Sequence, residues 1–151
     1  MRGLTRGERT LAADVFGGEL LTGPVRILRA PWLKRAFVAG RWFGRDWIVW
    51  PTESVEADFS AAPIGKTAVF VHELVHVWQT QNGVNLLLSK LKAGDGPGAY
   101  RYPLDESCAW QALNIEQQAA MVEHAFRLSR GLPAPAAAAF YRARARFSCG
   151  L

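Results

Sequence analysis

The chain has 151 residues, of which 50% are hydrophobic and 21% are charged, with a net charge of +5. This length predicts a single domain over residues 1–151, and the apolar content excludes an intrinsically disordered chain. No apolar run reaches the roughly 18 residues that a membrane-spanning helix needs, so we expect no membrane partner. The N-terminus lacks the apolar stretch of a signal peptide, which predicts a cytoplasmic protein and leaves signal-peptide-independent export open.

The basic residues are scattered along the chain and are accompanied by no nucleic-acid-binding motif, so we expect no nucleic-acid partner. A solvated helix face or an acidic partner accounts for them better. Cys108 and Cys149 are too few for a metal knuckle or a disulfide framework. They are expected to be reduced thiols, with one disulfide as the alternative in an oxidising compartment. No pattern defines the oligomeric state.

In the first third of the chain, the sequence predicts one helix and then three strands. Residues 5–16 fit a helix that Thr5 caps and the Gly17–Gly18 pair ends. The β-branched and aromatic stretches 25–28, 36–43 and 46–50 are typical of strands. Gly44 and Arg45 between the last two predict a two-residue hairpin turn, so the sheet is expected to be antiparallel.

The rest of the chain predicts mainly helices. Ser60 is a candidate N-cap for a long helix that Asn82 and Gly83 end after Gln81. The glycine-rich segment 93–99 predicts a linker, and helices are expected over 105–130 and 135–147. The order of elements therefore predicts an α+β domain, with helices packed on one side of a small antiparallel sheet.

The most informative stretch is FVHELVHVWQ, residues 70–79, within the first of these long helices. Residues four apart project from the same helix face, so His72 and His76 can reach one metal ion. Glu73 lies beside the first histidine and can take a proton from a metal-bound water as a general base. Zn²⁺ is therefore the expected cofactor, and a core helix that carries two histidines without a metal is the alternative.

A catalytic zinc ion needs a third protein ligand. One zincin extension places a glycine and a third histidine after the motif, but Gln79 and Asn82 occupy those positions and exclude it. Glu116 is the better candidate, because a return helix can bring it against the HELVH helix and a buried carboxylate needs a partner. His124 on the same helix is the second candidate.

Three stretches together resemble a known family: LTRGERTLAADVFG, FVHELVHVWQTQ, and YRYPL followed by LNIEQQAAMVEHAF. HELVH followed by a helical glutamate resembles the gluzincin metallopeptidases, and more narrowly the small bacterial Vgr-related proteins. The resemblance implies His72, His76 and Glu116 as ligands, Glu73 as general base, and a zincin-like fold in which the sheet packs against the HELVH helix and a ligand-bearing second helix. It also implies a peptide or protein substrate and an association with secretion.

The chain departs from the gluzincin pattern at Ala120, where many members have an aspartate that orients a ligand histidine. Glu123 is the candidate to replace it. A hydrolase also needs a donor for the developing oxyanion, for which we assign Tyr102, with Tyr100 as the alternative.

These patterns predict a zinc metallopeptidase and leave three other functions open. The first is a zinc-binding but non-proteolytic module in secretion or interaction. The second is an amidase that acts on cell-wall peptides. The third is a helical interaction domain without a metal.

Overall fold

The computed structural model describes residues 1–94 and 96–151, and over these residues it contains a small four-stranded sheet and five α-helices. The α+β class predicted from the sequence is therefore confirmed. Within the same residues, no helix combines the length and the apolar character needed to cross a membrane. The strands are β1 (Arg2–Gly3), β2 (Val25–Ala30), β3 (Phe37–Trp42) and β4 (Arg45–Pro51). The helices are α1 (Arg6–Phe16), α2 (Ile64–Gln81), α3 (Leu86–Ala93), α4 (Ile115–Ser129) and α5 (Ala138–Arg144).

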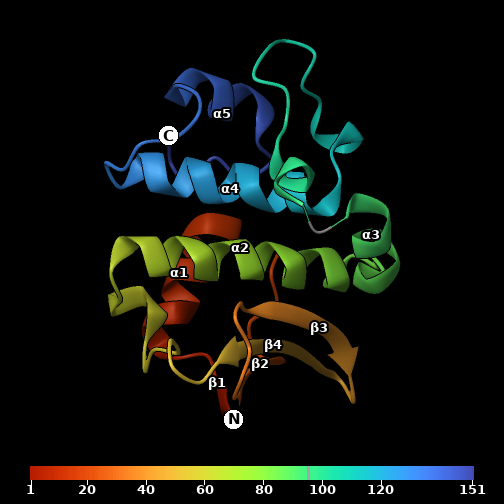
Figure 1. Ribbon diagram of the computed structural model, residues 1–151. Coiled ribbons are helices and arrows are strands. Elements are labelled where there is room, and N and C mark those ends of the chain that lie inside the picture. Colours follow the sequence, from red (N-terminus) through yellow and green to blue (C-terminus); the bar gives the residue numbers. More distant parts are fainter. Residues whose placement is uncertain (95) are drawn as a thin grey trace.

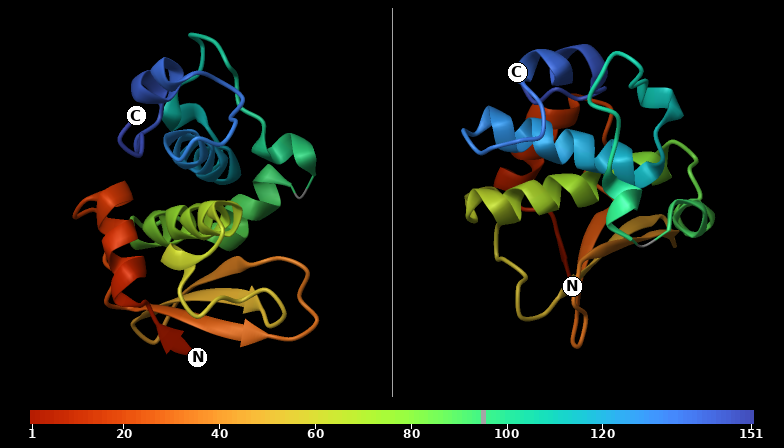
Figure 2. Two further views of the ribbon diagram at one scale, coloured as in Figure 1. Left: turned by 90° about the vertical axis from the view of Figure 1, so that its left-hand side faces the viewer. Right: turned by 45° about the horizontal axis from the view of Figure 1, so that its top comes forward.

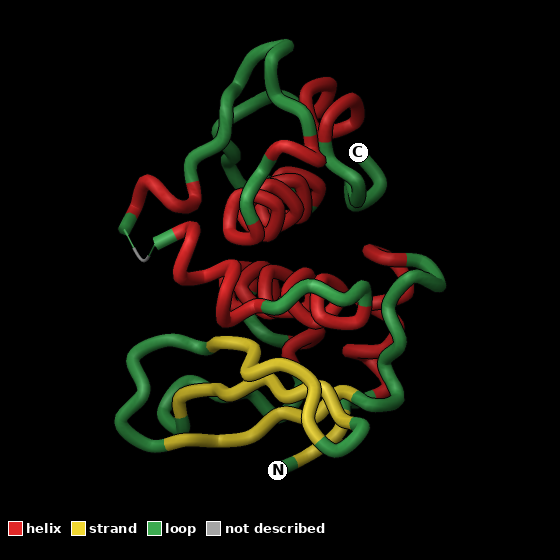
Figure 3. Tube along the Cα trace, turned by 90° about the vertical axis from the view of Figure 1, so that its right-hand side faces the viewer, coloured by secondary structure: helices red, strands yellow, loops and turns green. Residues whose placement is uncertain are grey.

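The elements are stacked in layers, with α2 lying between the sheet and α4 (Figure 1). The same order is seen from other sides, where α1 lies beside α2 and α5 lies beyond α4 (Figure 2, Figure 3). Because α2 is covered from two sides, it is apolar around most of its circumference, and most of its residues from Thr67 to Gln79 are buried. Polar side chains in that stretch are consequently held away from water.

The sheet has the order β1–β2–β4–β3 and is mixed, so the predicted antiparallel sheet is wrong in one pairing. The strands β3 and β4 form the expected antiparallel hairpin, but β2 lies on the other side of β4 and runs parallel to it. The hairpin turn is also one residue earlier than predicted. Phe43 and Gly44 occupy it with φ of 53° and 70°, the two positive values that a tight hairpin turn requires.

Two predicted helices begin later than expected. Instead of starting near Ser60, α2 starts after Pro63, because Asp58 caps a separate 3₁₀ turn over Phe59–Ala61. The predicted helix over 105–130 starts only at Ile115, where Asn114 and Gln117 exchange side-chain and backbone hydrogen bonds in a capping box. A local side-chain cap therefore determines where α4 begins, whereas the N-cap of α2, Pro63, makes no side-chain hydrogen bond.

The segment between these helices contains more structure than the sequence predicts. Residues 86–93 form α3, whose N-cap is Asn85, and a 3₁₀ turn spans Pro97–Tyr100. Asp95, in the middle of the predicted linker 93–99, lies outside the described residues. The helix predicted over 135–147 is observed as the shorter α5.

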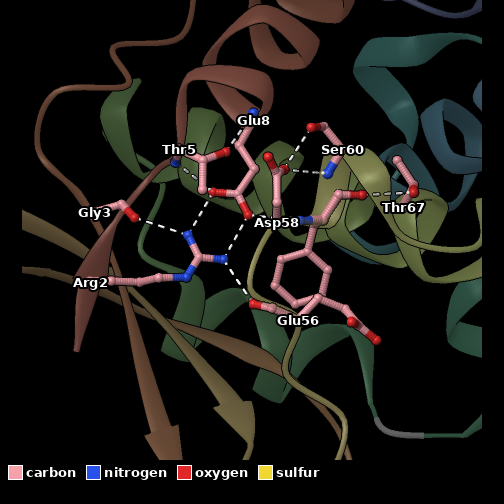
Figure 4. A network of polar contacts seen from close by, with 9 residues as sticks. Arg2, Gly3, Thr5, Glu8, Glu56, Asp58, Ser60 and Thr67 are labelled. Atoms are coloured by element: carbon pink, nitrogen blue, oxygen red, sulfur yellow. Dashed lines mark hydrogen bonds and ion pairs between the residues drawn. The ribbon is translucent and has the colours of Figure 1, made fainter.

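A buried ion pair anchors the N-terminus to the segment before α2 (Figure 4). Glu8 is fully buried, and its carboxylate accepts two hydrogen bonds of 2.7 Å from Arg2. The same carboxylate accepts hydrogen bonds from the backbone N–H of Thr5 at 2.8 Å and of Phe59 at 2.9 Å. Arg2 also donates to the carbonyl of Glu56. This network satisfies the buried charge and positions the chain that leads into α2.

Candidate metal centre

His72 and His76 lie on consecutive turns of α2, with ring centroids 5.0 Å apart, and both are buried. Opposite them, α4 places Glu116 in its first turn, just after the capping box. A carboxylate is favoured there because the N-terminal turn of a helix carries a partial positive charge. One ligand atom from each of these three residues lies within 4.8 Å of the others, so the cluster could hold a metal ion.

Two distances within the cluster fit a tetrahedral ion. The Nε2 atoms of His72 and His76 lie 3.3 and 3.2 Å from the same oxygen, Oε2 of Glu116. Charge-assisted N–H···O bonds are usually shorter, about 2.7–2.9 Å. Ligands bound to zinc at about 2.0–2.1 Å in tetrahedral geometry are about 3.3 Å apart. Two imidazoles that converge on one carboxylate oxygen at this separation therefore match the edges of a metal site.

Each histidine has a second contact that orients its ring. The Nδ1 of His72 lies 3.0 Å from Oε2 of Glu123, so Glu123 has the position that replaces the aspartate missing at Ala120. The Nδ1 of His76 lies 2.8 Å from Oε1 of Gln79. Because both Nδ1 atoms face acceptors, each ring can donate its Nδ1–H to that acceptor, and Nε2 is left as the nitrogen that would bind a metal after losing its proton.

The orientation of Gln79 is itself fixed by hydrogen bonds. Its amide nitrogen donates to the carbonyl of Ile115 at 3.1 Å and to Oε1 of Gln118 at 3.0 Å. The amide nitrogen therefore faces α4 and the oxygen faces His76. Sequence reasoning used Gln79 only as the residue that stands in place of the glycine of one zincin extension, and it missed this role. The available signal was its position three residues after His76, on the same helix face.

Electrostatics favour an ionised Glu116. Burial by itself would raise the pKa of Glu116, but its contacts with His72 and His76 hold that pKa well below its ordinary value. Burial likewise opposes a charged His72, yet its contacts with Glu116 and Glu123 raise the pKa of His72 to about 10. Lys90 of α3 adds a cation, with its Nζ 3.7 Å from Oε1 of Glu116. The carboxylate that faces the two rings is therefore charged at neutral pH.

Glu73 lies beside this cluster and faces a cavity of about 440 Å³, which His72, Tyr100 and Glu123 also line. Its side chain is buried, and Oε2 has no hydrogen-bond partner among the described residues. Buried polar atoms without a partner are uncommon and often mark functional positions. The free oxygen of Glu73 is consequently available to a group that enters the cavity.

Comparison with known proteins identifies relatives of this chain. No protein-family model matches it. The sequence is 31% identical over 140 residues to the type VI secretion system spike protein VgrG2b of Pseudomonas aeruginosa. The solved structure of the effector domain of that protein has the same identity and a TM-score of 0.69, and the match covers 85% of this chain and 75% of the domain. The chain belongs to the VgrG2b effector-domain family.

Membership in the VgrG2b effector-domain family confirms the resemblance to Vgr-related proteins. The match covers 83% of this chain but only 13% of the length of the spike protein. The gluzincin metallopeptidase assignment is not tested by these relatives and stays a prediction.

The structure separates the two tyrosines considered for the site. Tyr100 lines the cavity, with its ring centroid 6.1 Å from that of His72. Tyr102 is buried away from this cavity, and its hydroxyl lies 2.6 Å from Nδ1 of His124 and 3.1 Å from the hydroxyl of Tyr141. In this member of the VgrG2b effector-domain family, Tyr102 and His124 therefore form a second polar cluster, apart from the three predicted ligands.

Proposed function

We propose that this chain is a zinc-binding effector module associated with a type VI secretion spike. The observation that carries the proposal is the convergence of two imidazole nitrogens on one carboxylate oxygen at 3.2 and 3.3 Å. Kinship with the effector domain of a spike protein supports the association with secretion. The spike is the expected partner, and the domain is expected to travel with it.

The donor set supports zinc as the ion. Two imidazoles and one carboxylate are the ligands of several catalytic zinc sites, which leave a fourth position for water or substrate. The outer contacts of His72 with Glu123 and of His76 with Gln79 are also typical of such sites. The helix α2, which carries two of the proposed ligands, packs between the sheet and α4, which carries the third. This arrangement supports a zincin-like fold.

Elemental analysis of the purified chain tests the metal site. We expect about one zinc per chain, lost on substitution Glu116→Ala and kept on substitution His124→Ala. The His124 variant is a matched control, because it removes a polar side chain from the same helix outside the ligand cluster. Protein that takes up no zinc from added salt would refute the proposal.

A second function, hydrolysis of peptide bonds, is favoured by the unpartnered oxygen of Glu73. When bound, zinc would polarise a carbonyl and acidify a water molecule. Glu73 would then take the water's proton on Oε2 and pass it to the leaving amine. Tyr100, which lines the same cavity, is better placed than Tyr102 to donate a hydrogen bond to the developing oxyanion.

Substitution Glu73→Gln separates the two functions. The variant should keep the zinc and lose turnover of a broad peptide library, because glutamine has nearly the same shape but cannot accept the proton. Unchanged turnover would eliminate Glu73 as the base. If the wild-type protein bound zinc but cleaved no peptide, the remaining function would be that of a non-proteolytic zinc-binding module. Cleavage of cell-wall peptides but not of casein would favour an amidase.

A further inference from the structure

The cavity beside the metal centre extends along one face of α2. Gly65, Val69, His72 and Glu73 line it, at helical spacing that places them on the same side. Lys66 also lines it, six residues before His72, which corresponds to about 9 Å along the helix axis at about 1.5 Å per residue. The cavity therefore continues well beyond the ligand cluster, toward the N-terminal end of α2.

Three cations line this cavity and are here called the basic rim. They are Lys34 and Arg35 from the β2–β3 loop and Lys66 from α2. Lys66 is paired with Glu56, whereas Lys34 and Arg35 are exposed and form no ion pair with the described part of the chain. The rim consequently carries two positive charges that are not neutralised.

The acidic groups that line the cavity lie at the candidate metal centre. Glu123 faces His72, and Glu73 lies next to His72 in the sequence. The rest of the lining is largely apolar, with Trp50, Pro51 and Val69 among its residues. Low-dielectric walls concentrate the field of nearby charges, so the rim is expected to attract anions into the cavity.

We propose that the basic rim selects peptides that carry a carboxylate near the scissile bond. The proposal rests on the peptidase function proposed above. Within the rim, Lys66 lies about 9 Å from His72 along the helix axis, a length that an extended peptide covers in about three residues. A glutamate or aspartate side chain of a bound peptide, or its free C-terminal carboxylate, would meet Lys34 and Arg35 in the same cavity.

A peptide fits this cavity better than a nucleic acid does. Proteins that bind single strands present exposed aromatic faces on which successive bases stack. The two aromatic residues that line this cavity are Trp50, which is only 4% exposed, and Tyr100, which lies against His72. The rim thus offers charge without a stacking surface, which suits an isolated carboxylate.

Binding of labelled hexapeptides, followed by fluorescence polarisation, tests the rim without requiring turnover. All proteins would be zinc-loaded full chains in the Glu73→Gln background, so that no probe is cleaved. Each probe would carry one glutamate or one glutamine at a varied position. We expect the acidic probes to bind about three- to tenfold more tightly, as two solvent-exposed ion pairs allow. The preference should weaken between about 0.1 M and about 0.5 M NaCl.

The decisive comparison uses two double variants that remove the same charge. Lys34→Ala with Arg35→Ala should abolish the preference for acidic probes. Arg9→Ala with Arg142→Ala should preserve it, because these arginines are exposed on α1 and α5 and do not line the cavity. The proposal would be overturned if both double variants lost the preference for acidic probes equally, or if the parent protein showed no such preference. Stronger binding of an oligothymidylate than of acidic peptides would also overturn it.

Failure of the peptidase function would give a different pattern. Wild-type protein would then bind zinc and cleave no peptide, while the preference for acidic probes and its dependence on the rim stayed intact.

Discussion

Gln79 offers a sharp test of whether the outer contacts of the metal centre matter. Substitution Gln79→Leu preserves the approximate size of a fully buried side chain but removes three hydrogen bonds. The Nδ1–H of His76 and the carbonyl of Ile115 lose a partner inside the protein. At about 0.5–1.5 kcal/mol per hydrogen bond, the free energy of unfolding of the metal-free protein should fall by about 1.5–4.5 kcal/mol.

The loss of zinc affinity should be a separate effect. Without the acceptor at Nδ1, the ring of His76 can turn, and its proton can move to the nitrogen that should bind the metal. Outer contacts of this kind are often worth about 10- to 100-fold in metal affinity. We therefore expect the zinc dissociation constant of Gln79→Leu, measured by competition with a chelator, to rise by about this factor.

Gln81→Leu is a matched control on the same helix. Gln81 also makes three hydrogen bonds, two with the backbone of Leu21 and one with Asp46, but it touches none of the metal ligands. This variant should lose stability in urea unfolding and keep its zinc affinity. If both variants lost zinc affinity equally, or if Gln79→Leu bound zinc like the wild type, the claim that Gln79 acts through His76 would be refuted.

Three further predictions follow from local geometry. In the metal-free protein, burial opposes the charged form of His72, but contacts with Glu116 and Glu123 raise its pKa from 6.5 to about 10. The charged form therefore stabilises the fold, and this stabilisation is fully present below about pH 6.5. The free energy of unfolding should decline as the pH rises from about 6.5 to about 10, and a flat urea-denaturation profile would contradict this. Gly7→Ala should lower the melting temperature, because the added Cβ would lie 2.1 Å from Oγ of Ser60. Gly18→Ala is the control and should have little effect, because a Cβ at that position has no atom within 4 Å. Burial raises the pKa of the Cys149 thiol to about 12. Maleimide should therefore label Cys149 slowly at pH 8 in the folded protein and rapidly in urea, and rapid labelling of the folded protein would refute this prediction.

The parts of the site that could be predicted from the sequence depend on local spacing. His72 and His76 are four residues apart on a helix, so their common direction follows from helix geometry alone. Glu116 could be proposed because it lies on a second helix with apolar neighbours. Its actual place, in the first turn of α4, comes from the capping box at Asn114, which also made the helix shorter than predicted.

The parts that could not be predicted depend on contacts between distant segments. The parallel pairing of β2 with β4 joins strands separated by the β3 hairpin, and no local pattern encodes it. Lys90 reaches Glu116 only because α3 packs against α4. Lys34 was read as one of several scattered basic residues, and only the folded β2–β3 loop places it beside the cavity.

The middle position of α2 explains how the metal centre can be buried and still be reached. His76 and Glu116 are only 1% and 3% exposed, and neither lines the cavity, whereas His72 and Glu73 do. The cluster is therefore closed on the side of Gln79 and open on the side of Glu73. A ligand that approaches along the N-terminal half of α2 would pass Lys66 before it meets Glu73, and Lys34 and Arg35 line the same cavity. Charge selection would therefore act on the route to the proposed metal centre.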